Sequence, residues 1–151
     1  MHNYLGMTLD YMERGKVKIN MTKYISEMIK DSPIMIQEND KATTPATEQL
    51  FEESKGKCLN LKLHEGYHQT MAKGLFASKC ARPDIQTMIA VLCTQVKEPN
   101  KSDLIKAHRL PEYLNTTKDN ILSFSTKNLN IKERHVDMTG QNEMWLFLNT
   151  G

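Results

Sequence analysis

This sequence has few cysteines and no long apolar run, the features that mark disulfide-rich and membrane-spanning proteins. Its 151 residues include only three cysteines, Cys58, Cys80 and Cys93, and none of them forms a C-x-x-C pair. We therefore expect no disulfide framework, a reducing compartment, and thiols that act as small buried hydrophobes rather than as nucleophiles. No apolar run approaches the roughly 18 to 20 residues that span a bilayer, so a membrane protein is excluded.

An excess of charge of one sign is also lacking. The 20 lysines and arginines nearly balance the 18 aspartates and glutamates, which gives a net charge of +2. So small an excess does not by itself indicate nucleic acid. The N-terminal residues have neither the basic nor the apolar region of a secretory signal. We expect an intracellular protein, cytoplasmic or nuclear, that is not secreted.

The residues that are present predict a β-hairpin at the N-terminus. Residues 4–11 are rich in strand formers, residues 16–20 alternate polar and apolar side chains, and Gly15 supplies the turn between them. A short helix is predicted next, with Thr22 as its N-cap and Pro33 closing it.

The middle of the chain predicts a linker followed by helices. Periodicity is absent over residues 31–66, which we interpret as a wrapping connection or a linker between two lobes. Residues 67–79 carry apolar side chains on one side, and residues 84–96 have the strongest helical spacing in the chain. The predicted fold class is therefore α+β, with an N-terminal hairpin and a mainly helical bundle.

A third helix and one or two short strands complete the prediction. Ser102 is the expected N-cap of this helix, and Pro111 is expected to kink it or to end it near Leu110. Residues 121–125 predict a strand, and a weaker strand is predicted around His135.

Residues 64–68 read His-Glu-Gly-Tyr-His and match H-E-x-x-H, the signature of zinc metallopeptidases. That chemistry needs the two histidines one helical turn apart, with the glutamate as general base. Here the motif straddles the predicted helix start, and Gly66 weakens a helix by nearly 1 kcal/mol relative to alanine. The next histidines, His108 and His135, are not at a recognisable distance for a third ligand. We expect solvated or capping histidines and no metal site.

Several short motifs occur in an order that resembles a known family. They are, in chain order, YLGMTLDY at 4–11, KVKI at 16–19, YI at 24–25, ATTPA at 42–46, YHQTMAK at 67–73, ARPDI at 81–85, KA at 106–107, YLN at 113–115 and TKD at 117–119. This order resembles the reverse transcriptase of copia-type LTR retrotransposon polyproteins, in the part just downstream of the catalytic aspartates. The resemblance covers roughly residues 3–125.

The resemblance implies two nucleic-acid-binding elements. The hairpin would match the primer grip, with contacts from Tyr4, Leu5, Gly6, Met7, Lys16 and Lys18. The helices from residue 67 would match the thumb, with contacts from Gln69, Lys73, Lys79 and Arg82. The residues alone also allow a plain structural hairpin and an ordinary solvated helix face. Turn chemistry accounts for the Arg82-Pro83-Asp84 junction, which we interpret as structural.

The sequence also departs from the family pattern. Polymerase chemistry needs aspartates that hold two metal ions, but the chain has no Asp-Asp pair and only Asp10 near the hairpin. Gly74 and Ala77 stand where the family has larger apolar residues, and Pro111 interrupts a helix that the family keeps continuous. Residues 135–137 resemble the start of a ribonuclease H domain, without the other carboxylates of a nuclease site.

We therefore expect a fragment of an RNA-directed DNA polymerase that holds template-primer and is inactive alone. Its expected parts are the end of the palm at 1–30, a linker at 31–66, a thumb-like three-helix segment at 67–119, and a strand with a truncated ribonuclease H-like start at 120–151.

The expected partners are template-primer nucleic acid, bound weakly, and the missing palm and fingers of the polyprotein, with no membrane. No cofactor is expected in the fragment, whereas the intact family enzyme would use Mg. Two alternatives stay open: a small helical protein-interaction domain without catalysis, and the less favoured zinc metallopeptidase.

Overall fold

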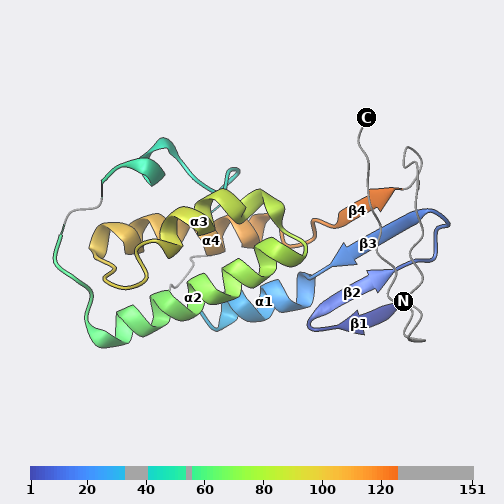
Figure 1. The fold of residues 1–151 in the computed structure, drawn as a ribbon, viewed down its shortest axis with the longest axis horizontal. Coiled ribbons are helices and arrows are strands. Elements are labelled where there is room, and N and C mark those ends of the chain that lie inside the picture. The colour runs from blue at the N-terminus through green and yellow to red at the C-terminus, as the bar shows by residue number, and fades with distance from the viewer. Residues whose placement is uncertain (33–40, 54–55, 126–151) are drawn as a thin grey trace, which may run out of the picture.

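The computed structural model describes residues 1–32, 41–53 and 56–125, in which a small antiparallel sheet lies at one end of a helical body (Figure 1). The strands are β1 (His2–Tyr4), β2 (Met7–Asp10), β3 (Lys16–Asn20) and β4 (Leu122–Ser125). The α-helices are α1 (Thr22–Lys30), α2 (Leu61–Cys80), α3 (Gln86–Cys93) and α4 (Lys101–Thr116). Two 3₁₀ turns are η1 (Glu48–Phe51) and η2 (Pro83–Ile85). The predicted α+β fold class is confirmed.

The sheet has the order β1-β2-β3-β4, and all neighbours are antiparallel. The prediction of one strand over residues 4–11 is wrong, because a tight turn at Leu5 and Gly6 divides it into β1 and β2. The turn at Gly15, with φ 77°, lies before β3 as predicted. The predicted strand at residues 121–125 is confirmed as β4, which pairs with β3. The regions around His135 and at 135–137 lie outside the described residues.

The register divides the sheet into an apolar and a polar face, because directly opposed residues share a face. The apolar face carries Tyr4, Met7, Leu9, Val17, Ile19, Leu122 and Phe124, together with His2 opposite Leu9. The polar face carries Asn3, Thr8, Asp10, Lys16, Lys18, Asn20, Ser123 and Ser125. Part of the apolar face packs against the helical core through Met7, Ile19 and Leu122, whereas Tyr4 and Phe124 are 60% and 55% exposed.

The predicted starts of α1, α3 and α4 are close to the observed ones, but the start of α2 and the capping residues differ. Thr22 is the first residue of α1 rather than its N-cap, and Asn20 Oδ1 accepts the Thr22 N–H at 2.7 Å. Helix α2 begins at Leu61, well before residue 67, because Asn60 caps it by accepting the Leu63 N–H at 3.0 Å. The end of the expected linker is therefore helical.

Helix α4 corrects two predictions. Its N-cap is Asn100 rather than Ser102: the Asn100 side chain accepts the N–H of Asp103, and Asp103 Oδ2 accepts the N–H of Asn100, which forms a capping box. The early end expected near Leu110 is wrong, because α4 continues through Pro111 to Thr116, whereas the alternative of a kink at Pro111 stays a prediction. Burial of Leu110 and Pro111 in the core offsets the hydrogen bond that proline removes.

The helix predicted at residues 84–96 is shorter in the structure. Residues Pro83–Ile85 form the 3₁₀ turn η2, and α3 then ends at Cys93. Ile85, Ile89 and Leu92 are almost fully buried, so the apolar spacing identified the buried face although the helix bounds differ. In the described part of the chain, no helix is long and apolar enough to cross a membrane.

Candidate nucleic-acid interface

The turn between β1 and β2 has a backbone that few residue types adopt. Tyr4 and Met7 are paired, so Leu5 and Gly6 form a two-residue loop with φ of 47° and 80°. Positive φ at both positions is typical of a type I′ turn, whose twist matches the flanking strands. A Cβ at Gly6 would lie 3.1 Å from Tyr24 Cδ2. The turn therefore needs glycine both for its backbone and for its close approach to α1.

Tyr24 connects this turn to helix α2. Its hydroxyl donates to the Lys73 carbonyl oxygen at 3.3 Å, and its ring centroid lies 5.3 Å from that of Phe76. Burial raises the pKa of the Tyr24 hydroxyl, with a smaller contribution from Cys80. The turn between β1 and β2 therefore packs against α1, and α1 contacts α2 through Tyr24. These contacts fix the position of the turn relative to the helices.

We expect Leu5→Asn to stabilise the protein by about 1 kcal/mol. Asparagine tolerates the left-handed region better than leucine, and the resulting Asn-Gly pair favours a type I′ turn. Leu5 is 63% exposed, so little buried apolar contact is lost. Urea unfolding measures the change, with Tyr11→Asn at another exposed site as the control. Equal stability of Leu5→Asn and the parent, or a loss, would contradict the positive φ at Leu5.

The structure does not bring together all residues predicted for the primer grip. Tyr4 and Met7 lie on the apolar face of the sheet, whereas Lys16 and Lys18 lie on the polar face. Both lysines contact Glu13: Lys16 Nζ bonds to its Oε1, and Lys18 Nζ lies 3.8 Å from its Oε2. The hydrogen bond from Lys16 lowers the pKa of Glu13. The lysine charges are therefore partly neutralised and face away from the apolar side.

The residues predicted for the thumb are also spread around α2. Gln69 is exposed and lies one turn before Lys73, whose Nζ is 2.9 Å from Asp31 Oδ2. Lys79 is exposed near the C-terminal end of α2, about 120° around the helix from Lys73. Only Gln69 and Lys73 share a face, and the Lys73 ammonium is already paired.

Arg82 is a structural anchor in this fold. Its side chain is 2% exposed, and its guanidinium donates to Asp84 at 2.6 to 3.2 Å and to the carbonyl and hydroxyl oxygens of Thr117 at 3.1 and 2.6 Å. It also lies 5.5 Å from the ring centroid of Tyr113, whose hydroxyl donates to Asp84 at 2.8 Å. This network supports the structural interpretation of the Arg82-Pro83-Asp84 junction and leaves Arg82 unavailable to a phosphate.

The opposing effects at Asp84 show how tightly the network is bound. Burial raises the pKa of its carboxyl group. The hydrogen bonds from Arg82 and Tyr113 lower that pKa by a larger amount, so the pKa of Asp84 is below its usual value. The pKa of Tyr113 is raised by burial and by its bond to Asp84. Sequence reasoning missed Tyr113 and Thr117 as partners of Arg82, because they lie more than 30 positions away and their spacing carries no local signal.

The His-Glu-Gly-Tyr-His segment lies wholly within α2, so the expectation that it straddles a helix start is wrong. His64 Nε2 lies 2.8 Å from the Val96 carbonyl oxygen, which occupies that ring nitrogen, whereas His68 is exposed. Across the described ranges, no group of three or more His, Cys, Asp or Glu side chains is arranged to hold a metal ion.

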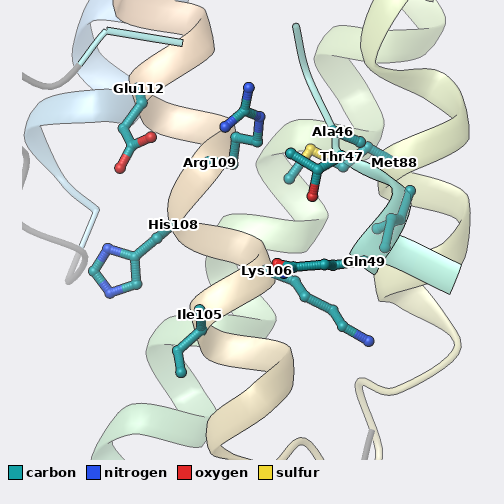
Figure 2. Close-up of a pocket in the computed structure, with 10 residues that line it drawn as sticks. Ala46, Thr47, Gln49, Met88, Ile105, Lys106, His108, Arg109 and Glu112 are labelled. Carbon is teal, nitrogen blue, oxygen red and sulfur yellow. The ribbon is translucent and has the colours of Figure 1, made fainter. Parts of the chain in front are cut away.

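A cavity of about 430 Å³ lies between residues 46–50 and helix α4. Figure 2 shows that His108 and Glu112 point to one side of α4, whereas Lys106 lies with Gln49 on the other. Arg109 is bonded to Thr44 through its Nε and Nη2, each at 2.9 Å. The charged groups lining this cavity do not converge on one point, so we do not assign it a function.

Comparison with known proteins gives one sequence similarity. The chain is 25% identical over 121 residues to a putative transposon Ty5-1 protein of Saccharomyces cerevisiae. The matched region covers 80% of this chain but 38% of the length of that protein. No protein-family model matches the chain, and no solved structure matches it. The similarity supports a retrotransposon-related origin for this chain.

Proposed function

We propose that the chain is part of a copia-type reverse transcriptase, comprising the primer-grip hairpin and the thumb, that contacts template-primer and is inactive alone. The observation that carries the proposal is the similarity to the transposon protein, which extends over 121 residues. A match of this length necessarily includes helices α2, α3 and α4. The sequence has no Asp-Asp pair, so the residues that would bind the catalytic metal ions belong to another part of the polymerase.

The contact between the hairpin and the helices supports a positioning role. A primer is held in register by backbone and phosphate contacts that do not read base edges. The Leu5-Gly6 turn meets that requirement, because Gly6 lies against Tyr24 and Tyr24 is bonded to α2. Leu5 is 63% exposed at the tip. The tip is thus accessible while its base is held by the helical body.

The charge distribution predicts weak binding. Lys16, Lys18 and Lys73 are paired with carboxylates, and Arg82 is buried. Phosphate contacts supply most non-specific affinity and release counterions, so binding falls steeply with salt. Because the net charge is only +2, we propose micromolar or weaker affinity for primed template.

The apolar face of the sheet supports a second contact, with the missing palm of the polymerase. Tyr4 and Phe124 on this face are more than half exposed. The chain matches only 38% of the length of its transposon relative, so much of a longer polymerase would lie outside it. An apolar face that the helices only partly cover is suited to burial against such a segment.

Fluorescence anisotropy with a labelled primer–template duplex tests the proposal. We expect binding at about 50 mM salt that weakens by at least tenfold at about 200 mM. Lys79→Glu should weaken binding and reduce the slope of log K against log salt by about 1, because it removes a phosphate contact. Lys97→Glu, an exposed substitution beyond α3, is the charge-matched control.

Two results would contradict the proposal. Equal losses in Lys79→Glu and Lys97→Glu would show that only net charge matters and that α2 makes no defined contact. Absence of binding at low salt would favour the helical protein-interaction domain instead. Primer extension by the chain alone, with Mg²⁺ and nucleotides present, would contradict the proposed lack of activity.

A further inference from the structure

Residues 41–53 form a strap across helices α3 and α4, and part of this strap is an arc at the surface. Ala42 and Leu50, which are 2% and 4% exposed, hold the strap on the core. Between these two anchors, none of residues 43–49 is buried. The arc contains a threonine followed by a proline, Thr44-Pro45, in a stretch without helix or strand. Exposed irregular segments of this kind are the ones that enzymes acting on proteins reach most easily.

Arg109 of helix α4 holds Thr44 through two hydrogen bonds. Its Nε donates to the Thr44 carbonyl oxygen and its Nη2 donates to the Thr44 hydroxyl oxygen, each at 2.9 Å. The Thr44 hydroxyl in turn donates to the Ala46 carbonyl oxygen at 3.1 Å. Thr44 is an exposed residue, so the side-chain oxygen of a surface threonine lies within hydrogen-bond distance of a guanidinium.

A guanidinium beside a hydroxyl group suits a phosphate carried by that hydroxyl. The guanidinium has five N–H donors and forms bidentate pairs with phosphate oxygens. The carboxylate of Glu112, one turn further along α4, points to the other side of the helix from Ala46 and Thr47 of the strap (Figure 2). A phosphate on Thr44 would therefore lie beside the cation of Arg109 rather than beside this carboxylate.

A second hydroxyl residue also precedes a proline in the sequence, at Ser32-Pro33, but its surroundings differ. Ser32 is half-buried, and its N–H donates to the Ile29 carbonyl oxygen at 3.2 Å, at the end of α1. It directly follows the carboxylate of Asp31, which would repel an added phosphate. The dipeptide pattern does not separate the two positions, whereas exposure and the neighbouring charge favour Thr44.

We propose that Thr44 is a phosphorylation site for a proline-directed protein kinase, and that its phosphate binds Arg109 and fixes the strap to α4. In the transfer, the bond between ADP and the γ-phosphoryl group of ATP breaks, and a bond from that phosphorus to Thr44 Oγ1 forms. The hydroxyl proton passes to a base of the kinase. The hydrogen bond to the Ala46 carbonyl is lost, and charge-assisted bonds from Arg109 replace it. This site is independent of the template-primer function proposed above.

Incubation of the full chain with a mitogen-activated protein kinase and Mg-ATP tests the site, with each phosphate located by mass spectrometry. We expect phosphate on Thr44, and transfer to Ser32 that is slower by at least about tenfold. Thr44→Val removes the hydroxyl and should abolish this phosphate, whereas Thr43→Val is the matched control and should keep it. Pro45→Ala should slow the transfer to Thr44 by at least about tenfold, because a kinase of this class selects proline after the acceptor.

Hydrogen exchange tests the contact between the phosphate and Arg109. Phosphorylation should slow the exchange of the strap amides by at least about fivefold, because the strap gains a second charged contact to α4. Arg109→Gln removes the guanidinium and should abolish this slowing. Lys101→Gln removes an exposed cation at the start of the same helix and is the charge-matched control. In the parent chain, about 1 M salt should also reduce the slowing, because it shortens the screening length to about 3 Å.

Three outcomes would overturn the proposal. The first is an absence of phosphate on Thr44, and the second is equal rates at Thr44 and Ser32, which would mean that the dipeptide pattern alone decides. The third is exchange of the strap amides that phosphorylation leaves unchanged, or slows equally in Arg109→Gln and Lys101→Gln. If Arg109→Gln does not fold, a slowing that about 1 M salt leaves undiminished would overturn the contact with Arg109 in the same way.

Discussion

Arg82→Ala is expected to lower the free energy of unfolding by about 2 to 3 kcal/mol, because it removes a buried guanidinium and its charge-assisted hydrogen bonds to the partly exposed Asp84 and to Thr117. Arg82 is 2% exposed and bonds to Asp84 and Thr117 from its position beside Tyr113. The substitution would leave the Thr117 carbonyl and the Asp84 carboxylate short of donors. Urea unfolding followed by circular dichroism measures the loss.

The dependence of this loss on pH separates the ion pair from simple loss of volume. The pKa of Asp84 in the folded protein lies below its usual value. Its contribution to stability is therefore fully present above the usual carboxylate pKa and is lost as the pH falls through the lower, folded value. In Arg82→Ala, burial remains while the main donor is gone, so this acid-dependent part of the stability should shrink, and the difference in stability between the parent and the variant should narrow as the pH falls.

Two comparisons make the result specific to Arg82. Arg82→Lys keeps the charge but cannot form the forked contact with Asp84, so an intermediate loss is expected. Lys79→Ala removes an exposed cation from the end of α2 and should change stability by less than about 0.5 kcal/mol. An Arg82→Ala loss no larger than that of Lys79→Ala would show that the network does not stabilise the fold.

Gly74→Leu is expected to destabilise the protein by about 3 kcal/mol, because α2 and α3 meet where the glycine has no side chain. A Cβ at this position would lie 2.5 Å from Ile89 Cδ1 and 3.3 Å from Leu110 Cδ2. Both of these side chains are fully buried, so neither can move freely out of the way. The close approach of the helices therefore favours a residue without a side chain at this position.

A double-mutant cycle isolates the contact with Ile89. Gly74→Ala gains about 1 kcal/mol of helix propensity but loses about 1 to 3 kcal/mol to overpacking, so we expect a net loss. Ile89→Val removes Cδ1, the atom that the new Cβ would meet. In that background Gly74→Ala should be neutral or stabilising, with a coupling energy of at least about 1 kcal/mol. Strict additivity of the two changes would rule out the steric contact.

The elements that sequence periodicity predicts are those with a one-sided burial pattern. The spacing of apolar residues identified α1 and the buried side of α3, and the alternation at 16–20 identified β3. Apolar spacing did not predict the element bounds correctly where a turn or a helix cap determines the backbone. The Leu5-Gly6 turn divides a run of strand formers, and Asn60 begins α2 inside a segment without clear periodicity. Pro111 stays inside α4 because long-range burial outweighs its local cost.

The candidate site was predicted less completely, because a side chain's partners depend on distant elements. The alternation in β3 placed Lys16 and Lys18 on one face, but only the pairing with β2 shows that this face is opposite to Tyr4 and Met7. Local turn chemistry accounted for Arg82 and Asp84 as a pair. It did not show that the arginine is buried beside Tyr113 and Thr117.

The sequence by itself determined the α+β class, the hairpin and the order of the helices, because these follow from local apolar spacing and turn chemistry. The tertiary structure decided which charges are free. It buried Arg82 and paired Lys73 with Asp31. Solvation and ion pairing act between segments far apart in the chain, so no local pattern determines them.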